Sequence, residues 1–359
     1  MTKILHVITT INRGGAENQL VVLVREQVKN GMDVSVIYLK GEPELEQEFL
    51  VAGAKVLHSI ANKWPIFQLF ELRVIAHAEK FLVHAHLPRA ELLTRFSAGK
   101  NDYVVSRHNA EPFFPGASRL LSSYLSRLVI QKASHVIAIS FAVSEFLIEK
   151  KEVKDLNKLS VVHYGYQPHP SEDRLTTKVN IGDRSRICIG TISRLTRQKD
   201  LPTLFSAFAQ FLIVHPKSTL LLVGGGEEKD HLENLAKDLG IYENIEWVGR
   251  TSKIPEFLSR MDIFVLSSLY EGFGLVLLEA MDAGVPLIAS NNSAIPEVLG
   301  EDFPGLVRTG DVDNFVKKME EYTDPGVREK VLRNQDVRLK TFSAEVMCSR
   351  ISKIYSLSH

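Results

Sequence analysis

Two carboxylates in one short stretch, Glu271 and Glu279, are the residues of this chain best suited to bind or activate a polar substrate. A Gly-Phe-Gly turn follows the first of them and opens into an amphipathic run, with apolar runs at residues 262–266 and 285–289 on either side. This order predicts a strand, a glycine turn, a helix and a second parallel strand. Eight residues make about 2.2 helical turns, so the two carboxylates can face the same side.

The start of this predicted helix is suited to an anion. The amides of Gly272, Phe273, Gly274 and Leu275 point out of a helix N-terminus, where negative charge is stabilised. Amides that hold a phosphate, next to carboxylates that grip hydroxyl groups, indicate a sugar nucleotide. A buried strand-to-helix turn with solvated acids is the alternative that the residues leave open.

Two cations, Arg194 and Lys199, directly follow a predicted strand at residues 186–192. Ligands of open α/β sheets bind outside the carboxyl ends of the strands. A guanidinium fork and an ammonium point charge at that edge suit a diphosphate. A solvated pair of surface cations is the alternative.

Glycine-rich turns follow two further predicted strands. Gly14 and Gly15 come after the first strand, and a run of three glycines centred on Gly225 ends the strand Thr219–Val223. Neither matches the G-x-G-x-x-G fingerprint, so no dinucleotide cofactor is indicated. Both turns allow close approach to a ligand or to neighbouring backbone. Glu227 follows the glycine run and Arg250 lies at the end of another predicted strand, and both are further candidates for ligand binding.

Histidines mark the strand ends of the first half. His84 and His86 would share one face of a strand, a spacing that can bind metal, but no third ligand is evident and no metal site is predicted. His108 is the stronger candidate for a functional histidine because it follows a strand and lies between Arg107 and Asn109. For His84 and His86, a position at a strand end that faces an interdomain cleft is the favoured interpretation, and ordinary packing is the alternative. The pair of aspartates at 311 and 313 precedes a predicted helix and is interpreted as an N-cap.

Bulk properties exclude several classes of protein. The chain has 359 residues with 45% hydrophobic and 24% charged residues, which is typical of two globular domains. Lys and Arg total 43, as do Asp and Glu, so no overall field attracts nucleic acid. Two cysteines give no disulfide framework. The first apolar run is too short for a signal peptide and no run reaches the ~20 residues that span a bilayer. A cytoplasmic protein is predicted.

Any membrane contact must then be peripheral. The segment 113–132 combines aromatic residues and cations with a leucine-rich helical pattern, which is typical of a helix at a membrane interface. An apolar loop at residues 64–67 could join it. Ordinary packing against the sheet is the alternative.

Strand patterns alternate with helical patterns from end to end, which predicts an α/β protein with parallel sheets covered on both faces. Residues 166–184 break the alternation and read as a linker. We therefore expect one unit at residues 1–165 and another at 183–342. The strands are expected at residues 4–8, 34–39, 81–85, 103–106, 135–139, 160–163, 186–192, 219–223, 245–248, 262–266 and 286–289.

In this order the motifs resemble those of the retaining glycosyltransferases of family GT4. The stretch from Glu271 to Ser290 is similar to the family's E-x7-E region, and Gly14 to Glu17, the Arg194 and Lys199 pair and the three glycines occur in the family's order. The resemblance implies a GT-B fold, in which two Rossmann-like doubly wound domains face an interdomain cleft. It also implies that the final helix, at about 343–359, crosses back to the first domain.

The resemblance further implies sugar transfer from a nucleotide-sugar donor with retention of configuration and no obligatory metal or cofactor. Arg194 and Lys199 would hold the diphosphate, Glu279 the ribose and Glu271 the sugar. Gly15 would lie against the phosphates and His108 would contact the donor sugar. Where many members carry N-G-[VI]-D before the linker, this chain has His163-Tyr164-Gly165-Tyr166, which leaves the contacts of that loop open.

The predicted function is therefore transfer of a hexose or related sugar to a glycan or lipid-linked acceptor in the synthesis of surface polysaccharide, lipopolysaccharide or another glycoconjugate. Peripheral membrane contact is expected and nucleic acid is not. A non-catalytic protein that binds nucleotide-sugar or glycan on the same scaffold is the alternative. The residues assigned to catalysis are His108, Arg194, Lys199 and Glu271; those assigned to donor binding are Gly14, Gly15, Gly225, Glu227, Arg250, Gly272, Phe273, Gly274, Leu275 and Glu279.

Overall fold

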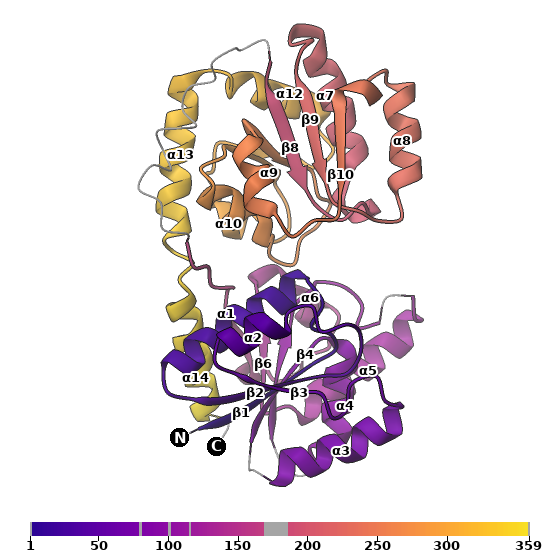
Figure 1. Cartoon of the computed structure of the whole chain (residues 1–359), viewed down its shortest axis with the longest axis vertical. Helices are drawn as coiled ribbons and strands as arrows, with labels where there is room; N and C mark the ends of the chain where they lie inside the picture. Colours follow the sequence, from indigo (N-terminus) through magenta and orange to yellow (C-terminus); the bar gives the residue numbers. More distant parts are fainter. Residues whose placement is uncertain (1, 79–80, 100–101, 115, 169–185, 358–359) are drawn as a thin grey trace. The chain divides into compact units, whose positions relative to one another are not determined.

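The chain folds into two compact units, shown in Figure 1. A computed structural model describes residues 2–78, 81–99, 102–114, 116–168 and 186–357. The first unit comprises Met1–Gln167 together with Phe342–His359, and the second comprises Pro168–Thr341. Most of the predicted linker lies outside the described residues. Each unit is a parallel sheet with helices packed on it, so the predicted fold class is confirmed.

The first unit is built on seven parallel strands in the order β3-β2-β1-β4-β5-β6-β7. The order reverses between β1 and β4, and crevices at such a reversal are where open α/β sheets bind ligands. The strands are β1 Lys3–Ile8, β2 Asp33–Tyr38, β3 Lys55–Leu57, β4 Leu82–His86, β5 Tyr103–Arg107, β6 His135–Ala138 and β7 Leu159–Val161.

Helices cover both faces of this sheet because each parallel crossover needs one. The helices α3, α4 and α5 pack in that order, while α1 lies beside α14 (Figure 1). Their bounds are α1 Gly15–Lys29, α2 Glu46–Val51, α3 Pro65–Ala78, α4 Pro88–Ser97, α5 Arg119–Lys132, α6 Phe141–Glu149 and α14 Ala344–Leu357, with a 3-10 turn η1 at Leu156–Lys158.

Helix α14 belongs to the first unit although the whole second unit precedes it in the sequence. Its buried residues Met347, Cys348, Ile351, Ile354 and Tyr355 join one hydrophobic core with residues of α1 and β1.

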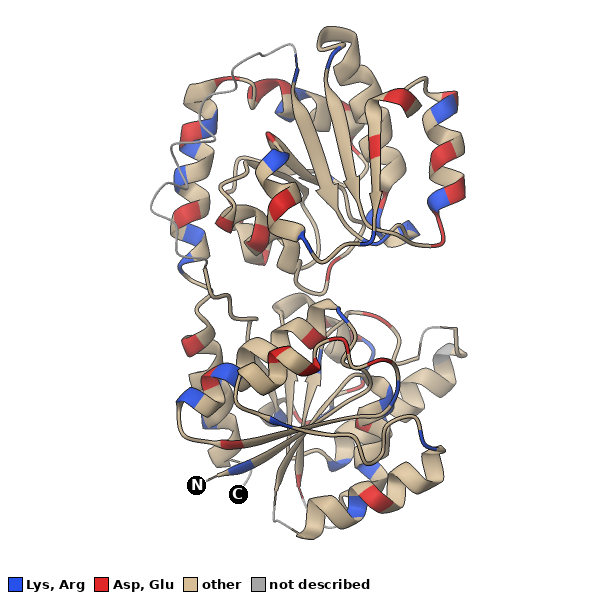
Figure 2. Ribbon diagram, in the orientation of Figure 1, with Lys and Arg blue, Asp and Glu red and all other residues tan. Residues whose placement is uncertain are grey.

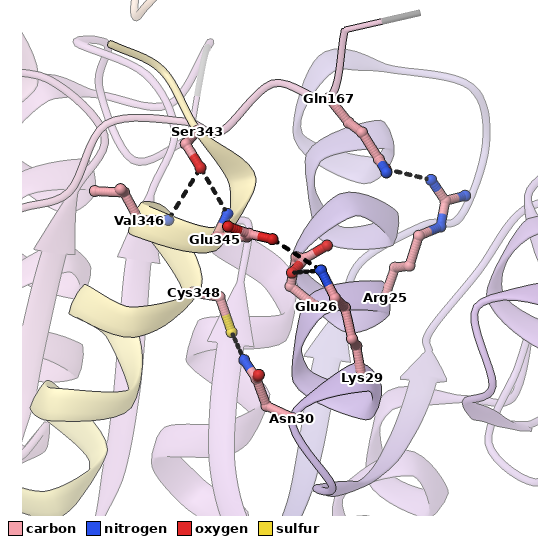
Figure 3. Close-up of polar contacts among 9 residues, drawn as sticks. All are labelled: Arg25, Glu26, Lys29, Asn30, Gln167, Ser343, Glu345, Val346 and Cys348. Carbon is pink, nitrogen blue, oxygen red and sulfur yellow. Dashed lines mark hydrogen bonds and ion pairs between the residues drawn. The ribbon is translucent and has the colours of Figure 1, made fainter. Parts of the chain in front are cut away.

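Polar contacts tie the N-terminal turns of α14 to α1, as Figure 3 shows. Lys29 Nζ lies 2.8 Å from Glu345 Oε1, and Asn30 donates a hydrogen bond to Cys348 Sγ. Ser343 accepts hydrogen bonds from the amides of Glu345 and Val346, as a helix cap does.

The second unit has six parallel strands in the order β10-β9-β8-β11-β12-β13, which reverses between β8 and β11. The strands are β8 Cys188–Ile192, β9 Thr219–Val223, β10 Ile245–Gly249, β11 Ile263–Leu266, β12 Leu287–Ser290 and β13 Leu306–Val307. The helices are α7 Leu201–Val214, α8 Lys229–Asp238, α9 Ile254–Arg260, α10 Leu275–Asp282, α11 Ile295–Leu299, α12 Val312–Glu321 and α13 Pro325–Leu339, with 3-10 turns η2 Arg197–Lys199 and η3 Tyr242–Asn244.

Two of these strands were missed by the sequence analysis, β3 and β13. Both lie at a sheet edge and have only three and two residues, too short for a hydrophobic period. The aspartate pair was interpreted correctly, because Asp311 caps α12 by accepting a hydrogen bond from the amide of Asn314.

The charged residues lie mainly on helices and loops, and the strands carry few of them (Figure 2). In the part of the chain that the structure describes, no helix combines the length and the apolar character needed to cross a membrane.

Candidate functional site

Two loops meet at the strand-order reversal of the second unit, one after β8 and one after β11. They bring together Lys199 and Glu271, whose Nζ and Oε1 atoms are 2.6 Å apart. Ser268 donates a second hydrogen bond, of 2.7 Å, to the same carboxylate oxygen. The lysine and glutamate side chains are only 11% and 8% exposed, so this ion pair is shielded from most of the solvent.

The two loops are also joined through their backbones. Leu269 N donates to the carbonyl oxygen of Gln198 at 2.8 Å, and the Gln198 side-chain amide donates to the carbonyl oxygen of Tyr270 at 2.9 Å. Ser267 Oγ donates to the carbonyl oxygen of Lys199. These bonds fix the loop that carries both predicted cations against the loop that carries Glu271.

Arg194 lies in the same loop and differs from Lys199 in its surroundings. It is exposed, and its guanidinium donates to Gln198 Oε1 at 3.2 Å. The two predicted cations therefore belong to one hydrogen-bonded loop, with the ammonium paired in the interior and the guanidinium at the surface.

Helix α10 begins where the sequence analysis expected it. Gly274 is its N-cap with φ of 88°, a left-handed conformation that glycine adopts without strain. Phe273 is buried and Gly272 is partly buried. The amide of Leu275 opens the helix, and Glu279 is partly buried in its second turn.

The three-glycine run packs against neighbouring backbone. A Cβ atom on Gly224 would overlap the carbonyl oxygen of Ser193, and one on Gly226 would overlap that of Leu195. Leu195 N donates to the carbonyl oxygen of Gly225 at 3.1 Å. Close approach to a neighbour, one of the two uses left open by the sequence, is thus the reason for glycine at 224 and 226.

The remaining candidates of this unit lie near the glycine run. A Cβ on Gly225 would come 3.1 Å from Arg250 Cγ, so the two candidates adjoin. Arg250 and Glu227 are both exposed. Their predicted contacts with a donor stay predictions.

Sequence reasoning missed several polar residues that support Glu271. Ser293, with φ of 51°, donates to the carbonyl oxygen of Glu271 at 2.7 Å, and Asn292 donates to the carbonyl oxygen of Ser268. Non-glycine residues in this backbone region are strained and cluster at functional sites. The available signal was the Ser-Asn-Asn-Ser run directly after the predicted strand at residues 286–289.

At the reversal point of the first unit, the turn after β1 opens α1. Gly14 is the N-cap of α1 and a Cβ there would overlap the carboxylate of Glu17. Thr10 Oγ1 donates to that carboxylate at 2.8 Å, and burial raises the pKa of Glu17. Gly15 is the first residue of the helix.

His108 follows β5, and both of its ring nitrogens have partners within the unit. Nδ1 lies 2.5 Å from Tyr164 Oη, and Nε2 lies 3.2 Å from His86 Nδ1. Burial, followed by the positive charge of Arg107, lowers the pKa of His108 to about 3. The imidazole is therefore neutral at physiological pH.

A third imidazole, His6, joins the two histidines of β4. Its ring lies beside those of His84 and His86, with one ligand atom of each ring within 4.8 Å of the others, and all three are buried. The sequence analysis found no third ligand because His6 lies on β1, a neighbour only through the sheet register, which pairs His6 with His84.

Arg107, just before His108, is held by two acids. Its guanidinium lies 2.9 Å from Glu91 and 3.8 Å from Glu152, and it covers the ring of Phe113. Burial raises the pKa of Glu91 to about 7 against the opposing effect of Arg107. This buried cluster fixes the end of β5 from which His108 emerges.

Two family models match the chain. "Glycosyl transferases group 1" matches residues 175–335, and "Glycosyltransferase Family 4" matches residues 13–169. The two matches together span most of both units.

Curated relatives and solved structures agree with these matches. The chain is 27% identical over 305 residues to UDP-Gal:alpha-D-GlcNAc-diphosphoundecaprenol alpha-1,3-galactosyltransferase of Escherichia coli, covering 80% of this chain and 78% of that one. It is 24% identical over 381 residues to the capsular polysaccharide biosynthesis glycosyltransferase CapM of Staphylococcus aureus, covering 99% and 97%. Its fold is similar to that of Anabaena Alr3699/HepE in complex with UDP-glucose, with a TM-score of 0.81 and 21% identity over 99% of this chain and 100% of that one.

The two-domain GT-B architecture expected from the motifs is thus confirmed, and the E-x7-E stretch lies inside the matched region. The chain belongs to the group 1 glycosyltransferases of family 4, and it is a glycosyltransferase.

Proposed function

We propose that this glycosyltransferase moves a hexose or related sugar from a nucleotide-sugar donor to a glycan or lipid-linked acceptor, with retention of anomeric configuration and without an obligatory metal ion. The observation that carries the proposal is the Lys199 and Glu271 pair, 2.6 Å apart at the strand-order reversal of the second unit. In open α/β sheets this is where a nucleotide binds.

The leaving group in such a transfer is a nucleoside diphosphate, so negative charge develops on its phosphate oxygens. Lys199, Arg194 and the amides that open α10 are the groups that would stabilise this charge. Glu271 holds the lysine ammonium in place before any donor arrives. A cation already oriented in this way needs no reorganisation when the charge develops.

The engagement of Glu271 bears on the route by which configuration would be retained, because a covalent adduct on this residue and attack on the same face would both give retention. One of its oxygens accepts hydrogen bonds from both Lys199 and Ser268, which makes the carboxylate a poor nucleophile. We therefore favour attack on the same face, with the departing phosphate taking the acceptor proton. A covalent sugar adduct on Glu271, sought by mass spectrometry of trapped enzyme, would contradict this route.

The names of the relatives guide the choice of substrates. The E. coli relative is named for transfer from UDP-Gal to a sugar on diphosphoundecaprenol, and the S. aureus relative for capsular polysaccharide. Synthesis of a surface polysaccharide or related glycoconjugate on a lipid-linked acceptor is the function that these names support. UDP-galactose and UDP-glucose are the first donors to test.

Peripheral membrane contact is part of the proposal, and α3 is the first surface that supports it. Phe67, Phe70 and Val74 follow helical spacing and are each more than half exposed, while Gln68 on the opposite face is fully buried and donates to backbone carbonyls. Trp64, just before the helix, is 78% exposed. Leu72 and Ala76 are buried on the inner face, so the helix is apolar on its exposed face as well as on its buried one, which suits a helix that meets lipid.

Helix α5 also has an apolar exposed face, although it buries Val129 and Ile130 in the core. Leu120 and Tyr124 are 86% and 63% exposed, whereas Ser122 and Ser126 face the interior. Helix α4 packs against both α3 and α5, so all three helices belong to one layer of the first unit. We propose that the layer α3–α5 rests on a membrane that carries the lipid-linked acceptor.

Vesicle co-sedimentation tests the membrane contact. Wild-type protein should pellet with vesicles of one-quarter anionic lipid, and the double variant Phe67→Ser with Phe70→Ser should remain in the supernatant with unchanged donor turnover on a soluble acceptor. A double variant Ile213→Ser with Val214→Ser, on exposed residues of α7, serves as the control and should still pellet. Wild-type protein that stays in the supernatant would contradict the membrane contact.

Calorimetric titration with a panel of UDP- and GDP-sugars, followed by assays of donor consumption, tests the transferase function. We expect one donor to bind and to be consumed, and Lys199→Ala to bind it more weakly and to consume it about 10²- to 10³-fold more slowly. Binding without any turnover would favour the non-catalytic alternative. No binding to any nucleotide-sugar by folded protein would refute the proposal.

A further inference from the structure

Polar side chains in the core of the first unit form one continuous chain of hydrogen bonds. They come from β1, β4, β5, α1, α14 and the loops after β5 and β7. In order along the chain they are Tyr164, His108, His86, His6, Gln27, Tyr355, His84 and Ser106.

The first part of this chain links His108 to α1. His108 Nε2 is 3.2 Å from His86 Nδ1, and His86 Nε2 is 2.9 Å from His6 Nδ1. His6 Nε2 is 2.8 Å from Gln27 Oε1. The second part continues from Gln27 Nε2 to Tyr355 Oη, from there to His84 Nδ1 and finally to Ser106 Oγ, at 3.2, 2.7 and 2.8 Å.

For neutral imidazoles Gln27 fixes the direction of every bond, because its amide oxygen only accepts and its amide nitrogen only donates. His6 must donate to Gln27 from Nε2, so its Nδ1 accepts from His86. By the same rule His86 accepts on Nδ1 from His108, which in turn accepts on Nδ1 from the hydroxyl of Tyr164.

The other branch obeys the same direction. The Tyr355 oxygen accepts from Gln27, its hydroxyl donates to His84 Nδ1, and His84 Nε2 donates to Ser106. One arrangement of protons therefore satisfies all the bonds, with each of the four imidazoles neutral and protonated on Nε2.

Burial agrees with neutral rings. It lowers the pKa of His6 to about 4, and it is the main reason that the pKa values of His84 and His86 lie well below their usual range. A metal ion between the three rings would need one lone pair from each. In this arrangement the Nδ1 lone pair of every ring already accepts a hydrogen bond.

We propose that His86, His6 and Gln27 are positioning residues that hold His108 as a neutral imidazole, protonated on Nε2 and fixed in orientation at the carboxyl edge of the first sheet. The part of the inference that concerns the contribution of His108 to sugar transfer rests on the proposed function. Because both ring nitrogens are used inside the unit, His108 presents a ring of fixed geometry at the carboxyl edge of the first sheet and transfers no proton.

Histidine side-chain NMR of the ¹⁵N-labelled protein at pH 7.5 tests the proton arrangement directly. We expect the signature of a neutral ring protonated on Nε2 for each of the four histidines, no titration between about pH 5.5 and 8.5, and no change on addition of one equivalent of Zn²⁺. An Nδ1-protonated His108, a His108 that titrates in this range, or rings that lose their proton to Zn²⁺ would overturn the proposal.

A matched pair of variants tests the positioning role. In His6→Gln the amide can still accept from His86 and donate to Gln27, whereas His6→Met has similar length and does neither. We expect His6→Gln to keep kcat within about threefold, and His6→Met to lose about 10- to 100-fold in kcat with an unchanged donor KM and altered His108 signals. Equal kcat in the two variants, or unaltered His108 signals in His6→Met, would overturn the positioning role.

The NMR measurement needs no turnover and no variant. It therefore remains decisive if His6→Met does not fold, and it separates failure of this inference from failure of the proposed transferase function.

Discussion

The ammonium of Lys199 and the carboxylate of Glu271 form a partly buried ion pair although 72 residues separate them in the sequence. Their loops follow β8 and β11, the two adjacent strands between which the order of the second sheet reverses. The topology therefore brings the two residues together. The sheet extends in opposite directions from β8 and β11, so the loops that follow these two strands begin side by side at one edge of the sheet. The strongest predictions concern this pair.

Replacing Lys199 with Ala should lower turnover by about 10²- to 10³-fold, because a cation oriented toward the leaving group is lost. Melting temperature should also fall, since Glu271 keeps its buried carboxylate without a countercharge. Steady-state kinetics and thermal unfolding measure the two effects. Lys253→Ala is the control, because that side chain is 72% exposed, and it should change neither. Wild-type turnover in Lys199→Ala would refute the diphosphate role.

Gly224→Ala should destabilise the second unit by more than about 4 kcal/mol, because its Cβ would overlap the carbonyl oxygen of Ser193. Gly240→Ala is the matched control. It also has positive φ, but no heavy atom lies within 4 Å of the added Cβ, so only backbone strain of about 1–2 kcal/mol is expected. Urea unfolding of both variants provides the comparison. Equal losses would show that the loop of Ser193 moves aside without cost.

The free energy of unfolding should fall as pH is lowered from about 6.5 toward 4. An unfolded histidine binds its proton near pH 6.5, whereas folded His6 and His108 bind theirs only near 4 and 3, so the unfolded state holds more protons in this window. Glu91 acts in the opposite sense: its folded pKa of about 7 gives stability that is present below about pH 4.5 and lost as pH rises through 7.

Two variants separate these contributions. His6→Gln should make the acid-side slope of stability shallower by up to one proton, and Glu91→Gln should make it steeper. Urea titrations at pH 5, 6 and 7.5 measure the slopes. A slope that is the same in wild type and His6→Gln would contradict the neutral, buried state of His6.

Ile351→Ala on α14 should cost about 2–5 kcal/mol, because the side chain is 4% exposed within the core of the first unit. Val346→Ala on the same helix removes a side chain that is 46% exposed and should cost less than about 1 kcal/mol. Thermal unfolding followed by proteolysis would show which unit opens first. If Ile351→Ala made the second unit alone unfold, that result would contradict the assignment of α14 to the first unit.

Hydrophobic period and turn chemistry were sufficient to predict most of the architecture. The long apolar runs of β1, β9 and β11 were found in the sequence because fully buried parallel strands read as continuous apolar segments. The helices α5 and α14 lie within the segments 113–132 and 343–359 in which helical patterns were predicted. The edge strands β3 and β13 escaped because two or three residues carry no period.

The candidate site was predictable only where its residues share a local motif. Glu271 and Glu279 lie eight positions apart on one turn and helix, so spacing alone indicated them. Ser293 and His6 act through partners on other strands, and a single sequence does not show which strands are neighbours. Only the sheet register brings such residues into contact.

The return of α14 to the first unit has a consequence for biosynthesis. The core that holds Met347, Ile351 and Tyr355 cannot close while the ribosome is still making the second unit, so the half of the enzyme translated first is the half completed last. Until the final helix emerges, the apolar residues of α1 and β1 that it covers remain open to chaperones. The second unit, whose strands and helices are contiguous in the sequence, can mature during that wait.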